Sequence, residues 1–91
     1  DFFAALFTAE GIPYEIFESE PGRSNVVARL PGNGTLGGHV VLLNHTDVVP
    51  ADERFWNVDP FGGDLVDGHI YGRGVADMKA DILAMAQAAN S

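Results

Sequence analysis

The pattern of hydrophobic and polar positions divides the first half of the chain into short helical and extended segments. Apolar residues recur at helical spacing in the first ten positions, which predicts the end of an amphipathic helix over residues 1–10. Gly11 follows, a residue type that often takes the left-handed conformation at a helix C-terminus. Residues 14–18 and 25–30 are rich in β-branched and aromatic side chains and predict two strands joined by a Pro-Gly turn.

The second half begins with the most apolar segment, residues 39–43. Its unbroken apolar run predicts a central strand covered on both faces. Residues 45–63 carry prolines, acids and aromatics without periodicity, which indicates a loop long enough to be functional. Residues 64–71 predict a hairpin around Asp67-Gly68, a pair typical of the type I′ turn.

Residues 79–90 are rich in alanine and predict a helix. The apolar side chains expected on its buried side are Ile82, Leu83, Met85 and Ala86. The order of a helix, strands, a long loop and a second helix predicts an α/β layer architecture.

Composition narrows the possible classes of protein. A chain of 91 residues with 46% hydrophobic and 20% charged residues is typical of one globular domain with a modest core. The net charge of −8, without a basic stripe, argues against nucleic acid as a partner. No apolar run approaches the ~20 residues of a membrane helix, so we expect no membrane partner.

The absence of cysteine excludes disulfides and thiolate zinc sites. Any transition metal would therefore need histidine and carboxylate ligands. The lack of cysteine favours a cytoplasmic location without fixing the compartment. The chain also begins at Asp1, without an initiator methionine, and its first residues resemble the middle of a helix. We therefore expect a piece of a longer protein.

The first candidate site is His45-Thr46-Asp47, directly after the predicted third strand. In extended backbone, residues i and i+2 point to the same side, so the imidazole and the carboxylate can lie together. A metal-binding histidine commonly donates its other ring N–H to a carboxylate. Such a tripeptide is also common by chance, and the alternative is that His45 is an ordinary polar residue at a strand end.

The second candidate is Asp77, which precedes the predicted C-terminal helix. A carboxylate at this place is the usual N-cap, and that is one interpretation. The other is a carboxylate that bridges two divalent metals about 3.5–4 Å apart. The loop residues Trp56, Asp59 and Pro60 are interpreted as packing and turn residues rather than substrate contacts.

Several motifs then occur in a fixed order. They are Leu42-Leu43-Asn44-His45-Thr46-Asp47-Val48-Val49-Pro50, Trp56, Asp59-Pro60-Phe61, Asp67-Gly68, Ile70-Tyr71-Gly72-Arg73-Gly74 and Asp77-Met78-Lys79. This ordered set resembles the co-catalytic zinc hydrolases that include aminoacylase, acetylornithine deacetylase, succinyl-diaminopimelate desuccinylase and glutamate carboxypeptidase. The resemblance covers residues 39–86 and implies a three-layer helix–sheet–helix, zinc-exopeptidase-like catalytic domain. Residues 1–91 would be its N-terminal fragment.

The resemblance implies a role for each candidate residue. His45 matches the first metal ligand, and Asp77 matches the bridging metal ligand. Asp47 matches the catalytic-site acid that orients the histidine. The family often has a cis peptide after the bridging acid, so we expect one at Asp77-Met78.

The resemblance also implies what the chain lacks. Complete enzymes of this kind hold two Zn²⁺ or Co²⁺ ions, with further acidic ligands, a second histidine and a glutamate general base after the Asp-Met-Lys motif. No ionisable side chain follows Asp81 in this sequence. We therefore expect the other ligands, the base, the rest of the catalytic domain and the lid or dimerisation domain to lie outside residues 1–91.

The expected function is hydrolysis of amide or peptide bonds in N-acyl amino acids or short peptides by the complete protein. The 91-residue chain alone is expected to be inactive and to bind metal weakly at most. Homodimerisation or self-association is the expected protein contact. The alternative function is a non-catalytic α/β module that self-associates or completes another chain.

Overall fold

The computed structural model describes residues 2–90, and the chain divides between His39 and Val40 into two compact units. The core is small. Among the described residues only Pro60, Gly74 and Ile82 are buried, and all three belong to the second unit. The elements are short, and most of their large apolar side chains stay exposed, so little apolar surface is removed from water.

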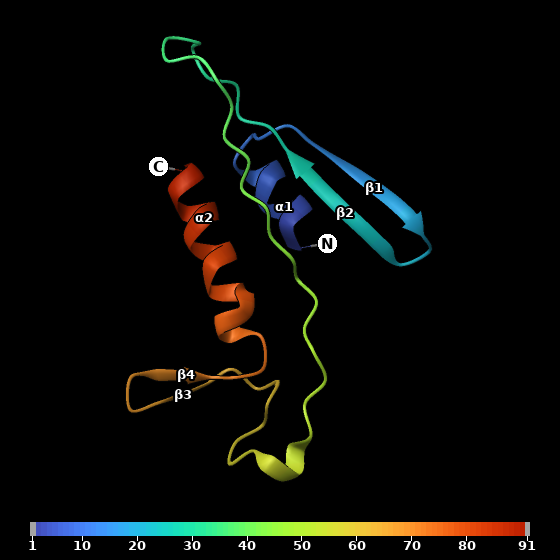
Figure 1. Cartoon of the computed structure of the whole chain (residues 1–91), viewed down its shortest axis with the longest axis vertical. Helices are drawn as coiled ribbons and strands as arrows, with labels where there is room; N and C mark the ends of the chain where they lie inside the picture. The colour runs from blue at the N-terminus through green and yellow to red at the C-terminus, as the bar shows by residue number, and fades with distance from the viewer. Residues whose placement is uncertain (1, 91) are drawn as a thin grey trace. The chain divides into compact units, whose positions relative to one another are not determined.

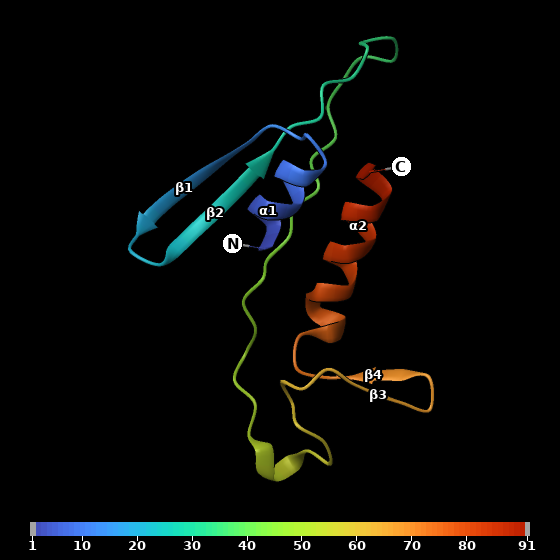
Figure 2. The same cartoon turned by 180° about the vertical axis from the view of Figure 1, so that it is seen from behind.

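The first unit consists of helix α1 (Phe2–Ala9) and an antiparallel hairpin of β1 (Tyr14–Glu20) and β2 (Arg23–Ala28) (Figure 1). Gly11 follows α1 with a φ of 66°, as the sequence predicts. Aromatic packing joins the helix to the hairpin, because the ring centroids of Phe7 and Tyr14 lie 6.0 Å apart. Figure 2 shows α1 beside the hairpin from the opposite side.

The second unit begins with an extended segment and contains five short elements. These are the 3₁₀ turn η1 (Glu53–Phe55), strands β3 (Asp64–Val66) and β4 (His69–Tyr71), the helical turn η2 (Val75–Lys79) and helix α2 (Ala80–Asn90). The β3–β4 hairpin confirms the sequence prediction. Asp67 and Gly68 have φ values of 50° and 77°, the two positive values that a type I′ turn requires.

The predicted central strand at residues 39–43 is wrong. The backbone there is neither helical nor paired, and Figures 1 and 2 show it as a plain coil. The side chains of Val40, Val41, Leu42 and Leu43 are 86%, 82%, 52% and 84% exposed. A strand needs the N–H and C=O groups of a neighbour, and within residues 2–90 every paired strand belongs to one of the two hairpins.

Helix α2 confirms the predicted C-terminal helix but corrects its buried face. Ile82 is buried, and Met85 and Ala86 are half-buried, at the i, i+3 and i+4 positions of one helical stripe. Leu83 lies about 100° around the helix from Ile82 and is 59% exposed.

Candidate metal centre

Two potential metal ligands that are 32 positions apart in sequence meet in the second unit. His45 lies in the extended segment before η1, and Asp77 lies within η2. The Nε2 atom of His45 is 3.1 Å from Oδ1 of Asp77. The structure therefore brings together the two residues that the sequence proposes as metal ligands.

Asp47 holds the opposite side of the same imidazole. Nδ1 of His45 lies 3.0 Å from the main-chain carbonyl oxygen of Asp47 and 3.4 Å from its Oδ1. The shorter contact is a hydrogen bond in which Nδ1–H donates to the carbonyl. Asp47 therefore orients the ring mainly through its backbone, with the carboxylate as a second, longer contact. This hydrogen bond keeps a proton on Nδ1, so that a metal ion would bind at Nε2 in place of the Nε2 proton.

The backbone around Asp77 is irregular. Gly74, with a φ of 83°, occupies the N-cap position of η2. Asp77 itself has non-helical angles, φ −126° and ψ 92°, and the Asp77-Met78 peptide is cis, as the family resemblance implies. The N–H groups of Lys79 and Ala80, which an N-cap side chain at Asp77 would bind, donate to the carbonyls of Gly74 and Val75 instead, so the N-cap interpretation of Asp77 is wrong. The irregular backbone directs its carboxylate toward His45 instead.

The pair is open to solvent. The side chains of His45 and Asp77 are 48% and 88% exposed, so an ion pair between them contributes little to stability. The hydrogen bond to the Asp47 carbonyl, with a further contribution from the Asp77 carboxylate, raises the pKa of His45 above its ordinary value of 6.5. The contact between His45 and Asp77 therefore does little to hold the fold together.

The geometry of the pair fits one metal ion. Two ligand atoms that bind one zinc ion at about 2.0–2.1 Å with tetrahedral angles lie roughly 3.3 Å apart. The observed 3.1 Å between Nε2 and Oδ1 is close to that separation, and it is also the length of an ordinary N–H···O hydrogen bond. Within residues 2–90, however, no group of three or more His, Cys, Asp or Glu side chains is placed to hold a metal. A zinc site normally needs at least three protein ligands, so the described residues provide part of one.

The loop between the two ligands is fixed by Trp56, Pro60 and Arg73. The Arg73 backbone N–H donates to the Pro60 carbonyl at 2.6 Å, and its guanidinium carbon lies 5.3 Å from the centre of the Trp56 ring. Pro60 is fully buried, and the Phe61 N–H donates to the carboxylate of Asp59 at 2.8 Å. These contacts support the sequence interpretation of this loop as packing and turn residues.

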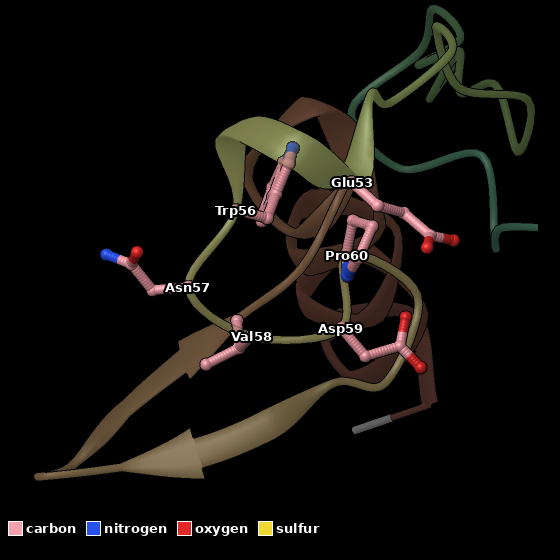
Figure 3. A pocket seen from close by; sticks show the side chains of 6 residues that line it. All are labelled: Glu53, Trp56, Asn57, Val58, Asp59 and Pro60. Atoms are coloured by element: carbon pink, nitrogen blue, oxygen red, sulfur yellow. The ribbon is translucent and has the colours of Figure 1, made fainter.

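A shallow pocket lies on this loop, away from His45 and Asp77. Figure 3 shows its lining, formed by Glu53, Trp56, Asn57, Val58, Asp59 and Pro60. Two of the lining residues, Trp56 and Pro60, also contact Arg73. None of the candidate metal ligands lines it.

Comparison with known proteins decides the family. Residues 41–91, which include both candidate ligands, match the peptidase family M20/M25/M40. The chain belongs to this family. Its mixed helix and strand content is consistent with an N-terminal portion of the α/β catalytic domain of M20 enzymes. No solved structure was found to match the chain.

Several curated relatives match almost the whole chain. The succinyl-diaminopimelate desuccinylase of Rhodospirillum centenum is 45% identical over 89 residues, which cover 93% of this chain and 21% of the relative. That of Methylocella silvestris is 45% identical over 94 residues, covering 98% and 24%. That of Bradyrhizobium sp. is 44% identical over 87 residues, covering 94% and 23%. The chain thus spans less than a quarter of the length of these M20 relatives.

The sequence placed Val48, Trp56, Arg73 and Gly74 in the ordered motifs but gave none of them a role in holding His45 near Asp77. Gly74 is buried next to Val48, and Arg73 stacks on Trp56. A usable signal was present, because two glycines flank Arg73 shortly before the site carboxylate. Glycine at such a place often marks a close approach of two backbones. Among residues 2–90, no helix combines the length and apolar character needed to cross a membrane.

Proposed function

We propose that this chain is the N-terminal part of the catalytic domain of a metal-dependent amide hydrolase. The observation that carries the proposal is the 3.1 Å approach of His45 Nε2 to Asp77 Oδ1. The remaining ligands, a glutamate general base and the lid or dimerisation domain would come from sequence outside residues 1–91. The coverage of only 21–24% of the relatives supports this division.

In this proposal the chain positions ligands rather than transferring protons. His45 presents the Nε2 lone pair while its Nδ1–H is held by the Asp47 carbonyl, which fixes the tautomer. Asp77 presents a carboxylate whose two oxygens suit a bridge between two divalent ions. Bound Zn²⁺ or Co²⁺ supplies Lewis acidity and lowers the pKa of coordinated water. The proton-transferring base lies elsewhere, since both ligands are committed to the metal.

The proposed substrate of the complete protein is an N-acylated amino acid or a short peptide. The curated relatives are named for removing succinyl from succinyl-diaminopimelate, which makes an N-succinyl diamino acid the first substrate to test. We expect the coding sequence after residue 91 to contain a Glu-Glu pair and a further histidine. The complete protein should hydrolyse succinyl-diaminopimelate in the presence of Zn²⁺ or Co²⁺.

Metal binding by the 91-residue chain tests the proposal directly. Calorimetric titration with Zn²⁺ should show one weak site that is lost in His45→Ala and in Asp77→Ala. His69→Ala is the matched control, because the Nδ1 atom of His69 also contacts a nearby backbone carbonyl, that of Asp67, at 3.1 Å. Binding that survives both ligand substitutions, or that is lost with His69, would overturn the assignment.

Catalysis by the isolated chain is a separate test. The purified chain with added Zn²⁺ or Co²⁺ should not hydrolyse N-acyl amino acids or dipeptides, because residues 1–91 supply no general base to the proposed mechanism. Turnover that co-purifies with the chain and disappears in Asp77→Ala would contradict the proposed division of the active site.

One observation favours a second candidate function. The apolar side chains of residues 40–43 are exposed on backbone that pairs with no strand among the described residues. Such a segment can add to the sheet edge of another chain. A non-catalytic module that self-associates would then sediment with a mass that rises with concentration, and Val41→Lys would restore the monomer. In that case Zn²⁺ titration should show no specific site.

A further inference from the structure

Besides the contact of His45 with Asp77, the segment that carries His45 approaches the rest of its unit at Val48. From residue 40 to residue 50 every side chain is exposed except Val48, which is half-buried. Val48 lies three positions after His45. Any contact that holds Val48 therefore limits how far the imidazole can move.

The partner of Val48 is Gly74, three positions before Asp77. Gly74 is buried and has a φ of 83°, in the left-handed region that favours glycine. A Cβ atom at this position would lie 2.2 Å from Cγ1 of Val48 and 3.4 Å from its Cβ. The first separation is far inside van der Waals contact, so the valine side chain occupies the space that any larger residue at 74 would need.

Arg73, the residue before Gly74, makes further contacts to the loop. The Arg73 guanidinium stacks over the Trp56 ring, and the Arg73 backbone N–H donates to the Pro60 carbonyl. The Val48–Gly74 contact joins the two ligand-bearing segments three residues from each candidate ligand. The loop remains attached through Arg73 even if that contact is lost.

We infer that Val48 and Gly74 are positioning residues, whose close contact sets the separation of His45 Nε2 and Asp77 Oδ1. Neither residue touches the proposed metal. The contact joins the two ligand-bearing segments at positions three residues away from each ligand. The metal-binding consequence rests on the proposed function, whereas the positioning itself can be measured without metal.

A set of four variants separates this role from the conformational requirement of Gly74 alone. Gly74→Ala adds both the clash with Val48 and the cost of a side chain at positive φ. Gly68→Ala adds only the second cost, because Gly68 has a φ of 77° and open space around it. Val48→Ala combined with Gly74→Ala removes the Cγ1 clash and leaves the tolerable 3.4 Å contact. Val48→Ala alone loosens the contact without a clash.

The metal-free readout is the nuclear Overhauser effect between the His45 ring protons and the Asp77 β-protons. It should be present in the parent chain and in Gly68→Ala, lost in Gly74→Ala and restored in the double variant. Equal loss in the double variant and in Gly74→Ala, or an unchanged signal in Gly74→Ala, would overturn the inference. If Gly74→Ala unfolds, the Val48→Ala chain decides, with a weakened signal expected and an unchanged signal contradicting it.

Zn²⁺ titration of the same set provides the second readout. Supporting residues around metal ligands are commonly worth about 10–100-fold in affinity, so Gly74→Ala should weaken binding at least about tenfold. The Zn²⁺ affinity of the double variant should lie within about threefold of that of Gly68→Ala, a smaller difference than the loss of about 10–100-fold expected for a missing support. A parent chain that binds no Zn²⁺ would contradict the proposed function, while the nuclear Overhauser effect would still decide the positioning role.

Discussion

The β3–β4 hairpin and residues 40–43 belong to the same unit and differ in what their structure depends on. The hairpin has two strands of three residues, all exposed, yet it forms because Asp67 and Gly68 adopt the turn that joins them. Residues 40–43 are far more apolar, yet they remain unpaired and exposed. Local turn chemistry is sufficient for a short hairpin, whereas a central strand depends on neighbours that are distant in sequence.

The candidate metal centre shares the second kind of dependence. His45 follows the unpaired segment directly, and its contact with Asp77 spans 32 positions. The site therefore rests on long-range contacts, among them Val48 against Gly74 and Arg73 against Trp56. Variants that affect one kind of element and spare the other can separate local from long-range stabilisation.

The largest expected effect is at Ile82. Because Ile82 is the one buried large hydrophobic residue among those described, Ile82→Ala should lower the free energy of unfolding of the second unit by about 2 kcal/mol, at the lower end for Ile→Ala. The matched control is Leu83→Ala, which should cost much less because Leu83 is 59% exposed. Urea unfolding followed by circular dichroism measures both. Equal costs at the two positions would show that the observed face of α2 is wrong.

The next effect is local to the hairpin turn. Gly68→Val places a β-branched residue at a φ of 77° and should cost roughly 1–2 kcal/mol, the penalty for left-handed backbone. Cross-strand proton contacts between Leu65 and Ile70 should disappear, while those between His45 and Asp77 persist. Asp67→Gly is the control and should keep the hairpin. Loss of the His45 contacts in Gly68→Val would mean that the hairpin and the site are not independent.

A smaller effect concerns pH. Because the Asp47 carbonyl and the Asp77 carboxylate raise the pKa of His45, its contacts stabilise the fold fully below the ordinary pKa of 6.5. That contribution is lost as the pH rises through the raised pKa. Asp77→Asn should move the pKa of His45 downward in a nuclear magnetic resonance titration, and Asp81→Asn should leave it in place. An unchanged pKa of His45 in Asp77→Asn would contradict the observed contact.

The smallest effect is expected in the unpaired segment. Leu43→Ala should change the free energy of unfolding of the 91-residue chain by less than about 0.5 kcal/mol, because the side chain is 84% exposed. The urea midpoint measures this. A cost comparable to that of Ile82→Ala would show that residues 40–43 are buried in solution, for example between two copies of the chain.

The sequence predicted those elements whose cause is local. The helix before Gly11, the Asp67-Gly68 hairpin and helix α2 follow from periodicity and turn residues that lie within each segment. It failed at residues 39–43, because an apolar run indicates a tendency to be covered but does not provide the neighbouring strands. It also placed Leu83 on the wrong side of α2, because which stripe is buried depends on what packs against it.

The candidate site was predicted by residue type and only partly by arrangement. The proximity of His45 and Asp47 follows from a spacing of two residues, whereas their main contact through a backbone carbonyl does not. The N-cap alternative for Asp77 was a sound local interpretation, but the N–H groups of Lys79 and Ala80 that it requires donate to the carbonyls of Gly74 and Val75. The Val48–Gly74 contact involves two segments far apart in sequence, so no local pattern reveals it.

The central claim is that His45 and Asp77 bind one metal ion together. Substoichiometric Co²⁺, a paramagnetic ion, should broaden the nuclear magnetic resonance signals of residues around His45 and Asp77 at the same Co²⁺ concentration, and spare those around His69. The broadening should vanish from both segments in either His45→Ala or Asp77→Ala. Broadening centred elsewhere, or confined to one of the two segments, would contradict the account.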